Sequence, residues 1–238
     1  MSTSVALGGR VVGIRFSSDA IIPELASELT ADADPAVPPN VSVLVGGDAA
    51  AGSTGKHLLY SQGHLVGAFR SAEALEAAML RAIGELAAAA PGSTRLRGIP
   101  VICGGRAAVV DTRLAGALER AERRVASAGI EVARGVRSVA IDADAQAVGV
   151  AEPSAVLESI RTSGVADNLD AAHQIALLVL PSVPEHATPA ERLAQLMPWL
   201  GPEADAEHLG RLAPLAGNVV APSGADAVGP LLEDALLA

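Results

Sequence analysis

Aromatic side chains are scarce in this chain, which has two Phe, one Tyr and one Trp among its 238 residues. Half of the residues are nevertheless hydrophobic, so the length allows a sizeable core built mainly from Ala, Val and Leu. So few aromatic rings cannot form the stacking platform on which proteins hold single-stranded nucleic acid. Basic residues are also outnumbered, 17 against 27 acidic ones, and the formal charge of −10 repels a phosphate backbone. The composition therefore predicts that the chain does not bind nucleic acid.

Cysteine is almost absent as well, since Cys103 is the only one in the sequence. A single cysteine allows no intrachain disulfide and no cysteine cage for a metal, and its apolar surroundings favour a small buried side chain. No apolar run reaches the roughly 18 residues that a membrane-spanning helix needs. The first residues, MSTSVALGG, also lack the basic and apolar segments of a signal peptide. We therefore expect a cytoplasmic protein that does not enter a membrane.

Hydrophobic periodicity predicts an α/β fold in two parts. Residues 1–93 are expected to form a small N-terminal α+β lobe, and residues 94–238 an α/β domain, with one continuous domain as the alternative. In the first part the predicted strands cover 5–16, with Gly8 and Gly9 near a turn, 40–46, 57–61 and 64–69. The predicted helices cover 20–29 and 72–90, the second with Ser71 as its cap and a buried stripe of Leu75, Met79, Ile83 and Leu86. In the second part the predicted strands cover 99–103, 107–110, 130–133, 136–142, 147–151, 174–180 and 218–221. The strand over 174–180 is apolar without alternation, which predicts burial on both faces. The predicted helices there cover 112–128, 155–163, 189–200, 205–215 and 223–237.

The second part is arranged around the stretch 96–128, in which a buried strand leads into a helix. The first turn of such a helix offers unpaired backbone N–H groups, and nucleotide-binding folds use them to hold a phosphate. A phosphate loop also needs glycines for close backbone approach and a lysine that neutralises the β- and γ-phosphates. This stretch has no lysine, so the loop that normally carries out this task is missing.

Two alignments with a phosphate loop remain open. In one, Gly105 matches the first glycine and Thr112 the Ser/Thr, while Val110 and Asp111 stand where the second glycine and the lysine belong. In the other, the strands over 99–103 and 107–110 form a hairpin, and Asp111, Thr112 and Arg113 are all that is left of the loop. Open α/β sheets bind ligands beyond the carboxyl ends of their strands. The candidate ligand-binding residues are therefore Gly105, Asp111, Thr112 and Arg113.

Two weaker motifs are better explained by a structural role than by binding of a ligand or metal. Residues 52–57, GSTGKH, have Ala50 where a phosphate loop needs its first glycine, and a hairpin pattern follows where a helix is required, so a surface loop is favoured. Asp142 and Asp144 lack the further oxygen ligands of a calcium loop, which favours a plain acidic turn. We predict no metal site.

The order of the segments 58–87, 97–118, 137–150 and 175–200 resembles the HPr serine kinase/phosphorylase-related family of small P-loop proteins. The resemblance covers about residues 55–238. It implies a P-loop-kinase-like mixed sheet flanked by helices, with a hairpin and a helix before it. It also implies a glycine-rich phosphate loop at 105–112 and an acidic, Mg²⁺-binding motif close to 132–134, where this chain has Val, Ala and Arg.

Several residues that phosphoryl transfer needs in that family are missing from this chain, which argues against catalysis. Phosphoryl transfer depends on positioning and charge neutralisation, so losing the lysine, the glycines and the metal carboxylates together should abolish it. We therefore expect a non-catalytic, kinase-like protein that binds a peptide or protein partner and uses no cofactor. The exposed edge of the 57–69 hairpin is one surface for such binding, by strand addition, and a homo-oligomer is left open.

Two enzymatic alternatives remain open. An active phosphotransferase with a variant loop would place Thr112 on a metal, one of three arginines on phosphate and Asp111 as base or metal ligand. The three candidate arginines are Arg106, Arg113 and Arg134. A serine or metal hydrolase has no G-x-S-x-G or H-E-x-x-H motif to support it. Its nearest approach to an acid–base pair is Asp170 with His173, three residues apart.

Overall fold

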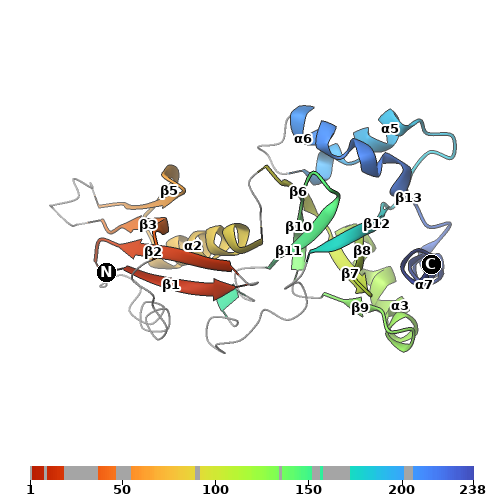
Figure 1. The fold of residues 1–238 in the computed structure, drawn as a ribbon, viewed down its shortest axis with the longest axis horizontal. Coiled ribbons are helices and arrows are strands. Elements are labelled where there is room, and N and C mark those ends of the chain that lie inside the picture. The colour runs from red at the N-terminus through yellow and green to blue at the C-terminus, as the bar shows by residue number, and fades with distance from the viewer. Residues whose placement is uncertain are drawn as a thin grey trace. The chain divides into compact units, whose positions relative to one another are not determined.

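The protein is a mixed α/β chain, as the sequence predicts, with two mixed sheets and several helices. The computed structural model describes residues 2–7, 10–18, 37–46, 55–88, 92–133, 136–151, 156–157, 172–200 and 206–238. The chain forms two compact units, the first made of residues 1–87 and 151–166 and the second of residues 88–150 and 167–238. The return of the chain to the first unit at 151–166 was not predicted. Figure 1 shows the elements of both units.

Five described strands form the sheet of the first unit, in the order β1-β2-β3-β4-β5. They are β1 (Ser2–Leu7), β2 (Arg10–Phe16), β3 (Pro39–Leu44), β4 (His57–Ser61) and β5 (His64–Phe69). The pair β2–β3 is parallel and the other pairs are antiparallel. A single strand over 5–16 is wrong, because β1 and β2 form an antiparallel pair with Leu7 opposite Arg10. The chain reverses between these two residues, where the sequence has the two glycines, Gly8 and Gly9, that were predicted to lie near a turn.

The core of the first unit lies between this sheet and α2 (Ala72–Ala88). Alternate residues of a strand point to the same face, and on β2 the buried ones are Val12, Ile14 and Phe16. Ser71 accepts a hydrogen bond from the N–H of Ala74 at 3.2 Å, which confirms the predicted cap of α2. The predicted stripe of α2 is also confirmed, with three residues buried and one partly buried in this core: Leu75, Met79, Ile83 and Leu86.

The sheet of the second unit has the order β6-β10-β11-β12-β8-β7-β9, with β13 also paired to β12. The strands are β6 (Thr94–Arg97), β7 (Ile99–Cys103), β8 (Arg106–Val110), β9 (Glu131–Val132), β10 (Val136–Ile141), β11 (Gln146–Ala151), β12 (His173–Val179) and β13 (Val219–Val220). β12 is parallel to both β8 and β13. β7 pairs antiparallel with β8 and β9, and β12 antiparallel with β11.

Helices cover both faces of this second sheet (Figure 1). On one face α3 (Ala115–Ser127) and α7 (Val228–Leu237) pack together, joined by an ion pair between Arg124 and Glu233 at 2.7 Å. The other face carries α5 (Pro189–Ala194), α6 (Ala206–Arg211) and the 3₁₀ turns Met197–Trp199 and Ala213–Asn218. Successive residues of β12, Leu178 and Val179, belong to the cores on opposite faces. The prediction that this strand is buried on both sides is therefore confirmed.

Prolines shorten two of the predicted helices. Thr188 and Pro189 start α5 as predicted, and Thr188 also forms a capping box with Glu191. The helix expected to continue to residue 200 ends at Ala194, because Pro198 has no N–H to donate to the carbonyl of Ala194 in the preceding turn. Pro214 has the same effect on the helix predicted over 205–215, which ends as an α-helix at Arg211. Within the described residues, none of the helices combines the length and the apolar character that crossing a bilayer requires.

Candidate functional site

The turn between β8 and α3 contains three of the four predicted site residues. β8 ends at Val110, and Asp111 leads into a 3₁₀ turn, Thr112–Leu114, which runs on into α3. Both backbone groups of Asp111 form hydrogen bonds. Its N–H donates to the carbonyl of Val179 on β12 at 2.9 Å, and its own carbonyl accepts from the N–H of Leu114 at 2.8 Å. The two central strands therefore set the position of this turn.

Asp111 is 2% exposed, and its carboxylate is bonded by Arg113 alone among the described donors. Oδ1 accepts the backbone N–H of Arg113 at 2.6 Å, and Oδ2 accepts Nε at 2.9 Å and Nη2 at 2.6 Å. The hydrogen bond to Asp111 raises the pKa of Arg113 above its usual value, against a smaller effect of desolvation. Asp111 thus caps the 3₁₀ turn, and a guanidinium neutralises it.

Trp199, which is distant in sequence, contacts this turn through the side chain of Arg113. The Cζ atom of Arg113 lies 5.6 Å from the centroid of the Trp199 ring, within the range of a cation–π contact. Trp199 is buried, whereas the side chain of Arg113 is 67% exposed. Trp199 was not predicted as part of this site, because no local spacing relates it to Arg113. We call Asp111, Arg113 and Trp199 the capped turn.

The capped turn already contains its own anion. In a phosphate loop the N–H groups at the helix start are left for the ligand, whereas here Asp111 takes the N–H of Arg113. The cation that could replace a phosphate-binding lysine is bonded to the same carboxylate. A phosphate arriving at this turn would compete with a buried, neutralised carboxylate, so the turn is better suited to stabilising the fold than to binding a nucleotide.

Gly105 lies at the opposite end of β8 from the capped turn. Gly104 and Gly105 have φ values of 55° and 84°, as a two-residue hairpin turn between β7 and β8 requires. The five residues of β8 lie between Gly105 and Asp111, and six steps of about 3.3 Å along extended chain place them roughly 20 Å apart. The alignment that joins Gly105 and Thr112 in one loop is therefore wrong. The structure has the hairpin of the other alignment, and it brings together Asp111, Thr112 and Arg113 but not Gly105.

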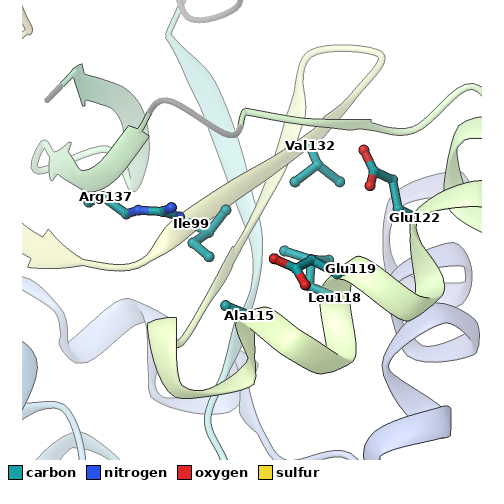
Figure 2. A pocket seen from close by; sticks show the side chains of 7 residues that line it. All are labelled: Ile99, Ala115, Leu118, Glu119, Glu122, Val132 and Arg137. Carbon is teal, nitrogen blue, oxygen red and sulfur yellow. The ribbon is translucent and has the colours of Figure 1, made fainter. Parts of the chain in front are cut away.

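A hollow of about 170 Å³ lies beside α3, away from the predicted site residues (Figure 2). Carboxylates of Glu119 and Glu122 and the guanidinium of Arg137 stand around an apolar floor. The space is below the roughly 300 Å³ from which small-molecule pockets normally start, and its two carboxylates disfavour phosphates. The sequence predicts a solvated charged face for α3 and does not indicate this hollow. The residues that line it are Ile99, Ala115, Leu118, Glu119, Glu122, Val132 and Arg137.

The β4–β5 hairpin forms as predicted, and β5 lies at the edge of the first sheet (Figure 1). Gln62 and Gly63 have φ values of 50° and 82°, typical of a two-residue hairpin turn. Among the described strands, β5 pairs with β4 alone. Leu65 is 56% exposed and Val66 is 50% exposed. We call β5, residues 64–69, the hairpin edge.

Other sequence candidates have structural roles or fall outside the described chain. Asp142 Oδ1 accepts the N–H groups of Asp144 at 3.0 Å and Gln146 at 2.7 Å, so it closes the β10–β11 turn, in line with the acidic-turn interpretation. Asp170 and residues 47–54 lie outside the described residues. Within the described chain, no three His, Cys, Asp or Glu side chains gather closely enough to hold a metal ion.

His173 begins β12, and its Nδ1 is buried without a hydrogen-bond partner in the described part of the chain. Burial lowers the pKa of His173 below its usual value near 6.5. Below that value the unfolded chain binds the proton more readily than the folded one, so this residue makes the protein less stable as pH falls. We expect His173→Gln to lose less stability than the unmodified chain between about pH 7.5 and about pH 5.5. Thermal melting of both proteins at the two pH values measures the loss of stability, and an equal loss in both proteins would contradict the prediction.

No family model, curated protein or solved structure matches this chain.

Proposed function

We propose that this chain is a non-catalytic protein that binds an extended segment of a peptide or protein partner, on a scaffold like that of the HPr serine kinase/phosphorylase-related family. The observation that carries the proposal is the capped turn. At the place where such a scaffold would hold phosphate, Asp111 is buried and bonded through three hydrogen bonds from Arg113.

The distribution of lysine supports the same proposal. Lys56 is the only lysine in the sequence, and it precedes β4 in the first unit. Phosphoryl transfer needs cations placed on the β- and γ-phosphates, and in the second unit that task would fall to arginines alone. Arg113 is the arginine closest to the helix start, and it is engaged by Asp111. Catalysis at the capped turn would therefore require breaking the interaction that stabilises it.

The hairpin edge supports the binding part of the proposal. An edge strand offers backbone N–H and C=O groups to an extended chain, and natural edges are usually protected by charges or prolines. Between His64 and Phe69 this edge has neither, and it exposes Leu65 and Val66. A segment added to β5 would cover these side chains while it pairs with the backbone.

The single tryptophan allows a direct test of the non-catalytic part. Because Arg113 lies on the ring of Trp199, intrinsic fluorescence reports on any ligand that rearranges the capped turn. We expect titration with millimolar MgATP to leave the fluorescence unchanged and to release no phosphate. A saturable change at micromolar MgATP, together with turnover that Asp111→Ala removes, would favour the variant phosphotransferase and refute the proposal.

A further inference from the structure

We infer that the partner of the hairpin edge is an extended segment in which acidic residues alternate with apolar ones. This inference rests on the proposed function and adds the chemistry of the partner to it. Its starting point is the charge of the hairpin. The chain as a whole carries −10, but residues 55–71 contain Lys56 and Arg70 and no Asp or Glu.

Strand pairing brings these two cations to the same end of the hairpin. His57 pairs with Phe69 across β4 and β5, so Lys56 and Arg70, the next residue on each side, both flank that end. Both side chains are exposed. At the other end, beside the turn, His64 is exposed as well. An extended segment along β5 would therefore pass between groups that attract carboxylates.

The carboxylates nearest in sequence belong to α2, which packs on the core face of the sheet. Glu73 is in the first turn of that helix, whose buried stripe contacts the face that contains Leu59. The side chains of Leu58 and Tyr60 alternate with Leu59 and so point to the opposite face. The charged residues that flank this hairpin in sequence, Lys56 and Arg70, are thus cations in a chain whose formal charge is −10.

Apolar side chains occupy the outer face between the charged ends. Tyr60 pairs with Leu65 and Leu58 pairs with Ala68, which places four apolar side chains in two neighbouring rows. Leu58 and Tyr60 are half-buried, and Leu65 and Ala68 are exposed. A strand presents alternate side chains to one face, so a partner with an apolar residue at every second position can cover these rows and direct its carboxylates to the ends.

A bulge divides the hairpin edge into two short stretches. The pairing shifts between Leu59 and Tyr60, so Val66 is an additional residue opposite β4. A bulge interrupts the regular spacing of edge N–H and C=O groups, so a partner that covers both apolar rows pairs with a short stretch on each side of Val66. A second copy of this chain fits less well, because residues 55–71 contain no carboxylate that could pair with Lys56 or Arg70 of the first copy.

Fluorescence anisotropy with two labelled, end-blocked peptides tests the inference on the full-length protein. One peptide alternates Glu with Val and the other alternates Lys with Val. We expect the Glu/Val peptide to bind and the Lys/Val peptide to bind at least tenfold more weakly. We also expect Lys56→Gln and Leu65→Ser each to weaken binding of the Glu/Val peptide severalfold, because the first variant removes a cation and the second removes an apolar contact.

Matched substitutions elsewhere provide the controls. Arg123→Gln removes an exposed cation from α3, and Leu237→Ser removes a leucine of similar exposure, 54%, from α7. Both should bind the Glu/Val peptide as the unmodified protein does. Carbodiimide coupling adds a second readout, since Lys56 has the only lysine amine that can form an amide with a peptide carboxylate. Mass spectrometry should find the Glu/Val peptide on Lys56.

The outcomes separate this inference from the proposed function. Equal binding of both peptides, or equal loss in the control variants, would overturn the acidic preference. A dimer that Leu65→Ser dissociates, in a protein that binds neither peptide, would assign the hairpin edge to a second copy and also overturn it. The non-catalytic proposal would survive both results, because it fails only if MgATP binds and is turned over.

Discussion

Replacing Asp111 by alanine should lower the free energy of unfolding by roughly 2–3 kcal/mol, as the sum of two losses. A missing N-cap side chain costs about 1 kcal/mol. The remainder comes from the charge-assisted bonds with Arg113, each of which is discounted because the arginine side chain is 67% exposed. Chemical denaturation followed by the fluorescence of Trp199 measures the change, since this ring lies beside the turn.

Two further variants separate the cap from the charge pair. Asp111→Asn keeps a capping oxygen but removes the negative charge, so we expect it to be destabilised less than Asp111→Ala. Arg113→Ala keeps the cap and removes the two side-chain bonds, at a cost of about 1 kcal/mol. If Asp111→Ala were as stable as the unmodified protein and gained affinity for MgATP, the carboxylate would be occupying an anion site rather than supporting the fold.

Gly13→Ala should be destabilising by about 3 kcal/mol, because the new methyl group has no space in the sheet of the first unit. A Cβ at Gly13 would overlap the carbonyl oxygen of Pro38 and lie 2.8 Å from the carbonyl carbon. These are backbone atoms, held next to the pairing of Gly13 with Pro39 and to the bond from the Gly13 N–H to Asn40 Oδ1 at 3.0 Å. The two strands would have to separate to admit the methyl group.

A second glycine offers the matched control. Gly116 lies in α3, where the nearest atom to an added Cβ is Arg120 Nη1 at 3.9 Å. Alanine favours helix more than glycine, so Gly116→Ala should raise the free energy of unfolding by about 0.5 kcal/mol. Urea titrations of both variants measure the contrast. A loss of less than about 1 kcal/mol in Gly13→Ala would show that β2 and β3 can shift apart.

Local sequence signals predicted most of the elements correctly. The β4–β5 and β7–β8 hairpins follow from short turns that need positive φ, and the start of α5 follows from Thr188 and Pro189. The signals were incomplete for β1 and β2, because the two glycines indicated a turn but the alternation on both sides of them also fits one strand. The parallel pairing of β12 with β8 and β13 joins segments far apart in sequence, so no local pattern could indicate it.

The candidate site was predictable only as far as its parts are neighbours in sequence. Asp111, Thr112 and Arg113 are consecutive, and the start of the helix makes them candidates. The ion pair within this triplet depends on a rotamer of Arg113 and could not be predicted from residue types. Trp199 and the hollow beside α3 depend on packing between distant segments. The hairpin edge was predictable as a surface because it is formed by one continuous stretch.

The discontinuous first unit determines how the protein can be dissected. Val156, from the returning segment 151–166, is buried in the core of that unit, and Leu157 packs against it. A proteolytic fragment ending near residue 87 would therefore lose part of its interior, although it keeps every strand of its sheet that the structure describes. In a complementation experiment, a synthetic 151–166 peptide should therefore restore the fold of the shortened fragment. An insertion between residues 150 and 151, where the chain passes from one unit to the other, should lower the stability of both units.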